Sequence, residues 1–199
     1  MQFDRAKLKA VILRTCQACP PDRLGAVKLH KVLYFLDMLH YAFSGSAVTG
    51  ARYVKRPFGP TCAALLPTLS EMARNGLIEI RETDYFGLRK KEYVGLAPME
   101  KGVLSEQEIA LLDDVIDFVC LKNSAKTISD YSHQQPWEMA EFGDEIPYST
   151  SYLLIPAEAS PEAVEATERG MRDIEAAGQG RQVAFADFGV FRRRVREML

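Results

Sequence analysis

The stretch 24–43, LGAVKLHKVLYFLDMLHYAF, decides the fold. Apolar residues cover most of the circumference of the helix that it predicts, and such a helix is normally buried at the centre of a bundle. Lys28, Lys31 and Asp37 interrupt this apolar surface, and a buried charge needs a partner or an exit to solvent. We therefore predict a central helix whose charged side chains reach solvent or form internal ion pairs, with contact to a partner protein as the alternative.

Helices are also indicated before and after this central one. Asp4 can cap a helix that ends near Cys19, because two prolines follow it. Ser105 and Glu108 form a capping box before apolar residues at helical spacing, which predicts a helix from 106 to about 121.

The segment between these helices predicts a β-hairpin. A turn or short helix after Gly59-Pro60 and a helix from about Pro67 to Gly76 come first. Two alternating strands, 77–82 and 91–96, then follow, with a turn between them. The expected fold class is α+β, mainly α-helical: a compact helical domain with a small antiparallel, winged-helix-like β-hairpin and a C-terminal helical appendage.

The last part of the chain differs in composition, so we expect a domain at 1–156 and a helical extension at 157–199. A surface helix capped by Ser160 is predicted first, and a basic amphipathic helix ends the chain. Its apolar face carries Phe188, Phe191 and Val195, opposite Arg192. This last helix can dock on its own domain, on a second subunit or on a partner protein.

Composition narrows the classes of function. The formal charge of −2 and the pI near 6.0 give no global attraction to nucleic acid or anionic membranes. The first residues do not read as a signal peptide, and nowhere do about 18 apolar residues run together. We expect a cytoplasmic protein that does not contact membranes.

The four cysteines predict no metal centre. Cys16 and Cys19 form a C-x-x-C pair, but Cys62 and Cys120 supply no second pair of ligands at a matching spacing. Plain reduced thiols are expected in a cytosolic chain of this length. We therefore predict no cofactor.

Catalytic motifs are also missing. Asp130, Ser132 and His133 resemble a hydrolytic triad, but neighbours on a helix point about 100° apart, so Ser132 cannot reach the adjacent imidazole. The carboxylates at 113–117 and 141–145 lack the histidines of a metal site. We expect no enzyme; a metal-dependent hydrolase assembled from scattered residues is the weaker alternative.

Nucleic-acid binding has limited support. The predicted hairpin carries Arg81, Arg89, Lys90 and Lys91, which would suit a basic wing. The helix before it, TLSEMAR at 68–74, offers too few cationic groups to neutralise phosphates. A winged-helix-like DNA-binding autoregulator is the second hypothesis.

The stretch 128–148, ISDYSHQQPWEMAEFGDEIPY, holds the only tryptophan of the chain. A helix capped at 123–124 should end near His133, and Pro136 should open a new turn that carries Trp137. We predict that the two rings lie on opposite sides of this bend and lock it against the central helix. A hot spot that faces a partner is the alternative.

Five motifs in this order resemble one known family, the Panacea domain of SocA-like antitoxins. They are KLHKVLYFLD (28–37), TGARYVKRPFGP (49–60), the glycine-closed helix with its hairpin, SEQEIALLDDVI (105–116) and the stretch 128–148. The likeness covers about residues 3–156. His30 departs from it, because a polar amide is expected there.

The resemblance implies an antitoxin that neutralises a toxin encoded nearby by binding it directly, without catalysis. Such a protein would bind its cognate toxin, and the sequence leaves a homodimer open as a further assembly. The residues that we assign to partner binding or to the family motif are Lys28, Lys31, Asp37, Gly59, Pro60, His133 and Trp137, with Phe188, Phe191, Arg192 and Val195 in the tail.

Overall fold

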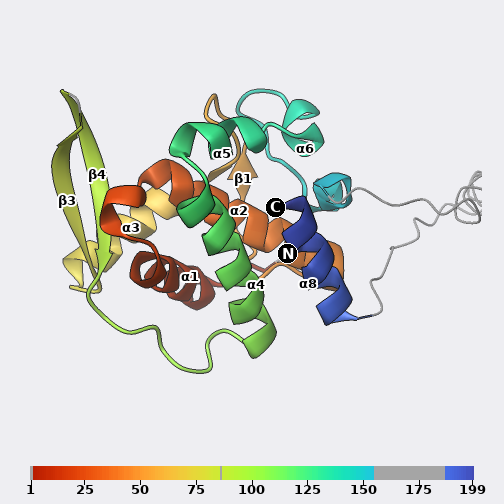
Figure 1. Cartoon of the computed structure of the whole chain (residues 1–199), viewed down its shortest axis with the longest axis horizontal. Helices are drawn as coiled ribbons and strands as arrows, with labels where there is room; N and C mark the ends of the chain where they lie inside the picture. Colours follow the sequence, from red (N-terminus) through yellow and green to blue (C-terminus); the bar gives the residue numbers. More distant parts are fainter. Residues whose placement is uncertain (1, 86, 155–186) are drawn as a thin grey trace, which may run out of the picture.

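Helices form most of the structure, and two small antiparallel hairpins complete it (Figure 1). The computed structural model describes residues 2–85, 87–154 and 187–199. Its elements are α1 (Arg5–Ala18), η1 (Pro21–Arg23), α2 (Ala26–Ser44), β1 (Tyr53–Val54), β2 (Thr61–Cys62), α3 (Leu65–Arg74), β3 (Ile78–Tyr85), β4 (Leu88–Gly95), α4 (Glu106–Ile116), η2 (Asp117–Lys122), α5 (Ala125–Tyr131), α6 (Gln135–Glu138), η3 (Tyr148–Leu154) and α8 (Phe188–Met198). The predicted class, α+β and mainly α-helical, is confirmed.

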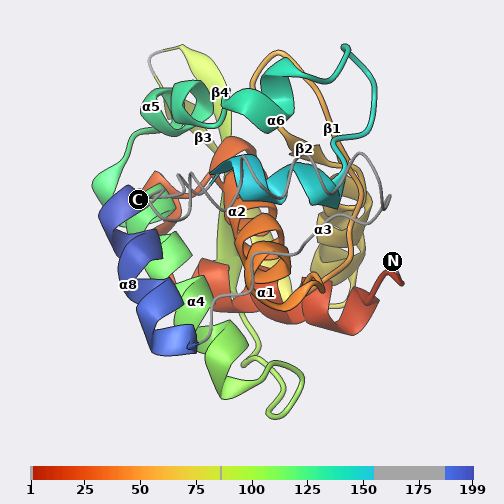
Figure 2. The same cartoon turned by 90° about the vertical axis from the view of Figure 1, so that its right-hand side faces the viewer.

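Helix α2 is the centre of the core. Its consecutive residues Leu33, Tyr34, Phe35 and Leu36 have no exposed surface, so every side of the helix is covered. The helix contacts α1, α4, α5 and α8, and Figure 2 shows it surrounded by other elements. No described helix combines the length and the apolar character needed to cross a bilayer.

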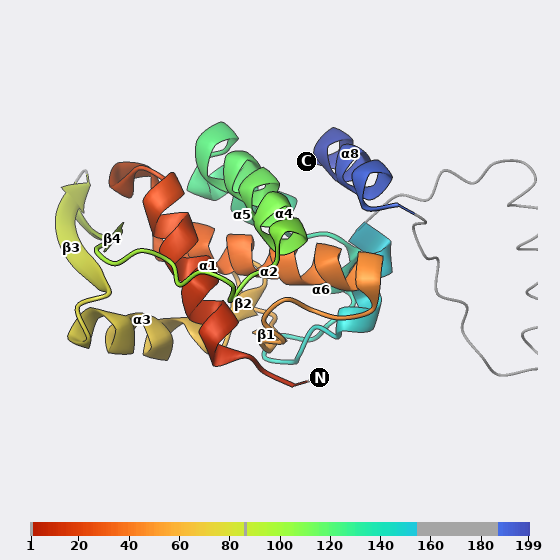
Figure 3. The ribbon, with the colours of Figure 1, turned by 90° about the horizontal axis from the view of Figure 1, so that it is seen from below.

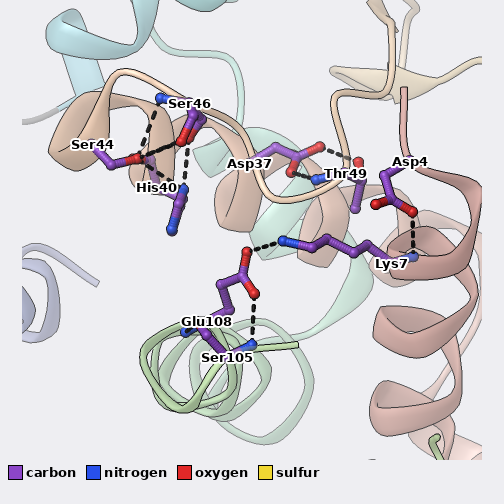
Figure 4. A network of polar contacts seen from close by, with 9 residues as sticks. All are labelled: Asp4, Lys7, Asp37, His40, Ser44, Ser46, Thr49, Ser105 and Glu108. Atoms are coloured by element: carbon purple, nitrogen blue, oxygen red, sulfur yellow. Dashed lines mark hydrogen bonds and ion pairs between the residues drawn. The ribbon is translucent and has the colours of Figure 1, made fainter. Parts of the chain in front are cut away.

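Capping explains where α1 and α4 begin. Asp4 accepts a hydrogen bond from the backbone N of Lys7, and Ser105 forms the predicted capping box with Glu108. The second carboxylate oxygen of Glu108 accepts from Nζ of Lys7 at 2.6 Å (Figure 4). The carboxylate that caps α4 therefore also ties this helix to α1.

The hairpin β3–β4 lies at the opposite end of the molecule from α8 (Figure 3). It pairs from Ile78 with Gly95 to Tyr85 with Leu88, so its strands are longer than predicted, and it packs on α1, η1 and α3. Helix α3 starts at Leu65 instead of Pro67, because a proline in the first helical turn removes an N–H that has no helical partner. The winged-helix likeness of this unit stays a prediction.

Two elements differ from the expected pattern. Strand β2, which pairs with β1, comes directly after Gly59-Pro60, and the predicted turn follows it at 63–64. Helix α4 ends at Ile116 and continues as the single π-helical turn η2, which ends close to the predicted boundary.

The last helix was predicted correctly: α8 begins after Asp187, whose side chain accepts from the backbone N of Val190. The helix that Ser160 was expected to cap lies outside the described residues. The division into 1–156 and 157–199 also stays a prediction.

Candidate functional site

The loop 55–60 joins β1 to β2, and a side chain of the central helix α2 forms hydrogen bonds with its backbone. Lys31 of α2 is only 1% exposed. Its Nζ donates to the carbonyl oxygen of Phe58 at 2.6 Å and to that of Pro60 at 3.0 Å. Lys31 and Gly59-Pro60, which belong to separate motifs of the sequence, therefore meet in one contact.

Gly59 lies between these two carbonyls in a left-handed conformation, with φ at +89°. A Cβ at this position would lie 2.5 Å from Nζ of Lys31 and 2.3 Å from Oγ of Ser132. Both neighbours are buried, so neither can move away easily. Glycine is needed here for its backbone angle and for its lack of a side chain.

Helix α5 holds the same loop from another side. Oγ of Ser129 donates to the carbonyl oxygen of Phe58 at 3.1 Å. Oγ of Ser132 donates to the carbonyl oxygen of Ser129 at 2.6 Å. The hydroxyl of Ser132 thus contacts the backbone of its own helix.

His133 and Trp137 stack on each other, with ring centroids 3.9 Å apart and an interplanar angle of 15°. The predicted bend is present, since α5 ends at Tyr131 and α6 begins at Gln135. The expectation that the bend separates the two rings is wrong. The short loop reverses the chain so that the rings meet.

Trp137 also contacts the loop 55–60. Its Nε1 donates to the carbonyl oxygen of Arg56 at 3.1 Å. Nζ of Lys55 lies 4.1 Å from the centroid of the indole ring, a cation–π distance. The His133–Trp137 pair therefore packs against the loop at Lys55 and Arg56.

The segment 139–145, after α6, pairs with the backbone of Lys55. The N–H of Lys55 donates to the carbonyl of Asp144 at 2.9 Å, and the N–H of Gly143 donates to the carbonyl of Lys55 at 3.1 Å. The ring of Phe142 packs edge-on against Trp137, with centroids 5.9 Å apart. The two segments thus form one continuous surface.

This surface displays the most exposed large apolar side chains of the described residues. Phe58 is 71% exposed, Met139 69% and Phe142 64%. We call these three residues the apolar corner. Sequence reasoning missed them, because an exposed apolar side chain in a loop has no periodic signal; the only hint was an aromatic residue directly before the family Gly-Pro.

The electrostatics under the corner favour neutral groups. Burial lowers the pKa of Lys31 to about 7. A neutral amine has two N–H groups and can keep both bonds to the loop carbonyls. The pKa of His133 is lowered as well, first by burial and then by the charges of Lys31 and Lys55.

His30 holds the segment that follows Gly59-Pro60. Its Nδ1 accepts a hydrogen bond from the backbone N of Cys62 at 3.1 Å. Burial, followed by the charge of Lys31, lowers its pKa to about 4, so the ring stays neutral and able to accept. An amide oxygen, which the resemblance leads us to expect at this position, could accept the same bond.

Asp37 holds a different part of the chain. It is fully buried. Its carboxylate accepts hydrogen bonds from the N–H of Thr49 at 2.7 Å and from the hydroxyl of Thr49 (Figure 4). It also accepts from the hydroxyls of Tyr53 at 2.7 Å and Tyr148 at 3.1 Å. Burial raises the pKa of Asp37, and these hydrogen bonds oppose the shift. Asp37 therefore fixes the start of the β1 segment and of η3.

Lys28 lies away from the corner. It is 5% exposed, and its Nζ donates to the carbonyl oxygen of Cys120 in η2 at 2.9 Å. The structure thus brings Lys31, Gly59, Pro60, His133 and Trp137 together, and places Lys28 and Asp37 at other contacts of the central helix.

The tail residues contact the domain itself. Phe191 and Val195 are fully buried, and the ring of Phe191 lies 5.0 Å from that of Phe43 on α2. Arg192 forms a two-pronged ion pair with Asp114 at 2.7 and 3.0 Å. Of the three docking modes open from the sequence, the free chain adopts docking on its own domain.

The carboxylates at 113–117 are engaged in ion pairs. Asp113 pairs with Arg14, Asp114 with Arg192, and Asp117 with Lys122. Within the described residues, no group of three or more His, Cys, Asp or Glu is placed to hold a metal ion. The four cysteines are buried and free.

The hairpin β3–β4 carries four acidic residues beside its four basic ones. Arg81 pairs with Glu79 at 2.7 Å and Lys90 with Glu92 at 3.1 Å. Cations neutralised in this way attract phosphates weakly, so the strand pair gives little support to DNA binding.

Comparison with known proteins assigns the family. No curated protein and no solved structure matches the chain. A family model described as "Antitoxin SocA-like, Panacea domain" matches residues 29–138, more than half of the chain. The matched segment runs from α2 to α6 and includes Lys31, Ser129, His133 and Trp137, which converge on the loop 55–60; the segment 139–145 lies outside it. The chain belongs to the SocA-like Panacea domain family of antitoxins.

Proposed function

We propose that the chain is an antitoxin that neutralises a cognate toxin by direct protein–protein binding, with no catalytic step. We further propose that the toxin docks on the apolar corner, Phe58, Met139 and Phe142. Membership of the family supports the first statement. The second is supported by the arrangement of the site.

The main support for this proposal is that residues of the family motif contact the loop 55–60, which contains Phe58. Lys31, Gly59 and Ser129 contact the backbone on either side of this ring, and Trp137 packs against Phe142. Exposed apolar side chains grouped in this way are typical of protein-binding surfaces. The buried motif therefore positions the surface, and the corner supplies the contact.

The motif residues have different roles in this proposal. Lys31 and Asp37 are too buried to touch a partner, so they act through the backbone that they hold. Trp137 is half-buried and can contribute to the contact surface as well as to the loop. Lys55 and Arg56 add positive charge at the edge of the corner.

The tail residues Phe188, Phe191, Arg192 and Val195 stay a second candidate surface. A toxin that bound them would first have to displace α8 from α2 and α4. That displacement would expose the buried side chains of Phe191 and Val195, so this route is energetically less favourable than docking on the corner.

The test is co-expression with the product of the adjacent gene. A chain that carries Phe58→Ser, Met139→Ser and Phe142→Ser should lose rescue of growth and bind the toxin at least about tenfold more weakly. Its unfolding midpoint should stay close to that of the wild type, because all three side chains are exposed.

The matched control changes three exposed apolar residues elsewhere: Leu96→Ser, Leu153→Ser and Val190→Ser. This variant should neutralise as the wild type does. Full neutralisation by the corner variant would remove the corner from the proposal. An adjacent gene product that is harmless alone, or that forms no complex, would remove the antitoxin function itself.

A further inference from the structure

A groove with a volume of about 940 Å³ lies away from the apolar corner, between η1, the first turn of α2, strand β4 and the junction of η2 with α5. Its lining holds six cationic side chains: Arg23, Lys28, Arg89, Lys90, Lys91 and Lys122. Asp22 is the one acidic residue among the described residues that line it. The groove is therefore positive in a chain whose formal net charge is −2.

The carboxylates that pair with these cations do not reverse this charge. Glu82, Glu92 and Asp117 are the partners of the hairpin and η2 cations, and none of the three lines the groove. The contacts of Glu82 to Arg89 and Lys91 are long, at 3.8 Å each. Exposed pairs as long as these leave Arg89 and Lys91 available to a ligand.

Lys28 gives the groove a buried positive group. Its Nζ has a backbone carbonyl, that of Cys120, as its hydrogen-bond acceptor. Burial lowers the pKa of Lys28, and the charges of Arg23 and Lys90 act in the same direction. A carboxylate in the groove would favour the ammonium form and would reverse that cost.

The groove also offers apolar surface. Leu66 and Leu121 are 54% and 41% exposed, and both line it, together with Val27 and Tyr93. A ligand that fits must therefore present carboxylates and apolar side chains side by side. The concave shape suits a narrow peptide segment, which can place both kinds of side chain in the groove.

We propose that this groove binds an acidic segment of a partner protein, in which carboxylates alternate with apolar side chains. The apolar side chains contact Leu66 and Leu121, and the carboxylates pair with Arg23, Lys91 and Lys122. The site is separate from the apolar corner. The inference holds whether or not the partner is the toxin.

The test uses the whole chain and a fluorescein-labelled peptide of about twelve residues made of Glu-Glu-Leu repeats. Fluorescence anisotropy at about 50 mM salt should detect binding that weakens as salt is added. The same peptide with glutamine in place of glutamate should bind at least about tenfold more weakly.

The variant Arg23→Glu, Lys91→Glu reverses two exposed charges of the groove and should lower affinity at least about tenfold. The matched control, Arg74→Glu with Lys101→Glu, makes the same change in net charge at exposed residues that do not line the groove, and should change affinity less than about twofold. Circular dichroism of both variants checks that they fold.

Three results would overturn the proposal. The first is absence of peptide binding by the wild type at low salt. The second is equal binding by the groove variant and its control. The third is a labelled DNA duplex that binds more tightly than the peptide and loses binding in the groove variant, which would assign the groove to nucleic acid.

Discussion

Lys31 and Asp37, a base and an acid, lie six residues apart on the central helix, and both are buried. Lys31 donates to two carbonyls of the loop 55–60, and Asp37 accepts from Thr49, Tyr53 and Tyr148. Each side chain thus fixes one end of the segment that contains β1. A central helix can position a surface loop with buried polar groups that never reach the surface themselves.

The two groups respond to pH in opposite directions. Burial raises the pKa of Asp37, so its contribution to stability is present in acid and is lost as pH rises through the folded-state value. Burial lowers the pKa of Lys31 to about 7, so its contribution is present at high pH and is lost as pH falls through that value.

Removing Asp37 should have the largest effect. Asp37→Ala leaves the N–H and hydroxyl of Thr49 and the hydroxyl of Tyr53 without their acceptor, and should lower the free energy of unfolding by about 3–5 kcal/mol in urea denaturation. Tyr148 keeps a bond to the carbonyl of Ala51 at 2.7 Å. The control is Asp113→Ala, which breaks a half-exposed ion pair and should lower the free energy of unfolding by about 1 kcal/mol or less. Equal losses of stability in the two variants would contradict the role of Asp37.

The Lys31 side of the comparison depends on Gly59. Gly59→Ala should cost about 2–3 kcal/mol, because it adds the penalty of a left-handed alanine to a clash with Lys31 and Ser132. Gly102→Ala is the control, since φ is +82° there and a Cβ meets no atom within 4 Å. The difference between the two variants measures the clash alone. A difference of zero would mean that the loop yields without cost.

The pH dependence distinguishes the two groups directly. Between the folded-state pKa of about 7 and the unfolded value of 10.5, the unfolded chain binds more protons at Lys31 than the folded chain does. The stability of the wild type relative to Lys31→Met should therefore rise by up to about 1.4 kcal/mol per pH unit from pH 7 to 8.5. Urea titrations at several pH values measure it. A constant difference would show that Lys31 keeps its charge in the fold.

Trp137 closes the Lys31 loop from outside, and its contribution should be the smallest. Trp137→Phe keeps an aromatic ring against His133 but removes the hydrogen bond to the carbonyl of Arg56. It should lower the free energy of unfolding by about 0.5–1.5 kcal/mol. Trp137→Ala should lower this free energy by more, because it also removes the buried ring. A Trp137→Ala variant that keeps wild-type stability but no longer binds the toxin would assign Trp137 to the interface instead of the fold.

Local signals explain what was predictable. The all-round apolar surface of α2, the caps at Asp4 and Ser105, and the glycine at 76 depend on neighbours within one helical turn, so sequence alone indicated them. Strands β1 and β2 have two residues each, and an isolated bridge joins Val54 to Glu145. No periodic pattern can develop over two residues.

The site was predictable in its residues and not in its geometry. The family motif identified Lys31, Gly59 and Trp137. Lys31 and Trp137 bind backbone carbonyls of the loop 55–60, and a contact with a backbone carbonyl cannot be read from the residue type. The stack of His133 on Trp137 was not predicted, because Pro136 indicates a new turn but does not fix the direction of the chain after it. The three-residue interval after α5 reverses the chain, which a proline by itself does not specify.

The π-helical turn η2 has a consequence for insertions and deletions. A π turn holds one more residue than an α-helical turn. Loss of one residue between 117 and 122 would convert it to an α-helical turn and shift the backbone around the carbonyl of Cys120, which accepts from Nζ of Lys28. In this part of the protein the number of residues matters as well as their type. Deletion of one residue there should be less tolerated than most single substitutions.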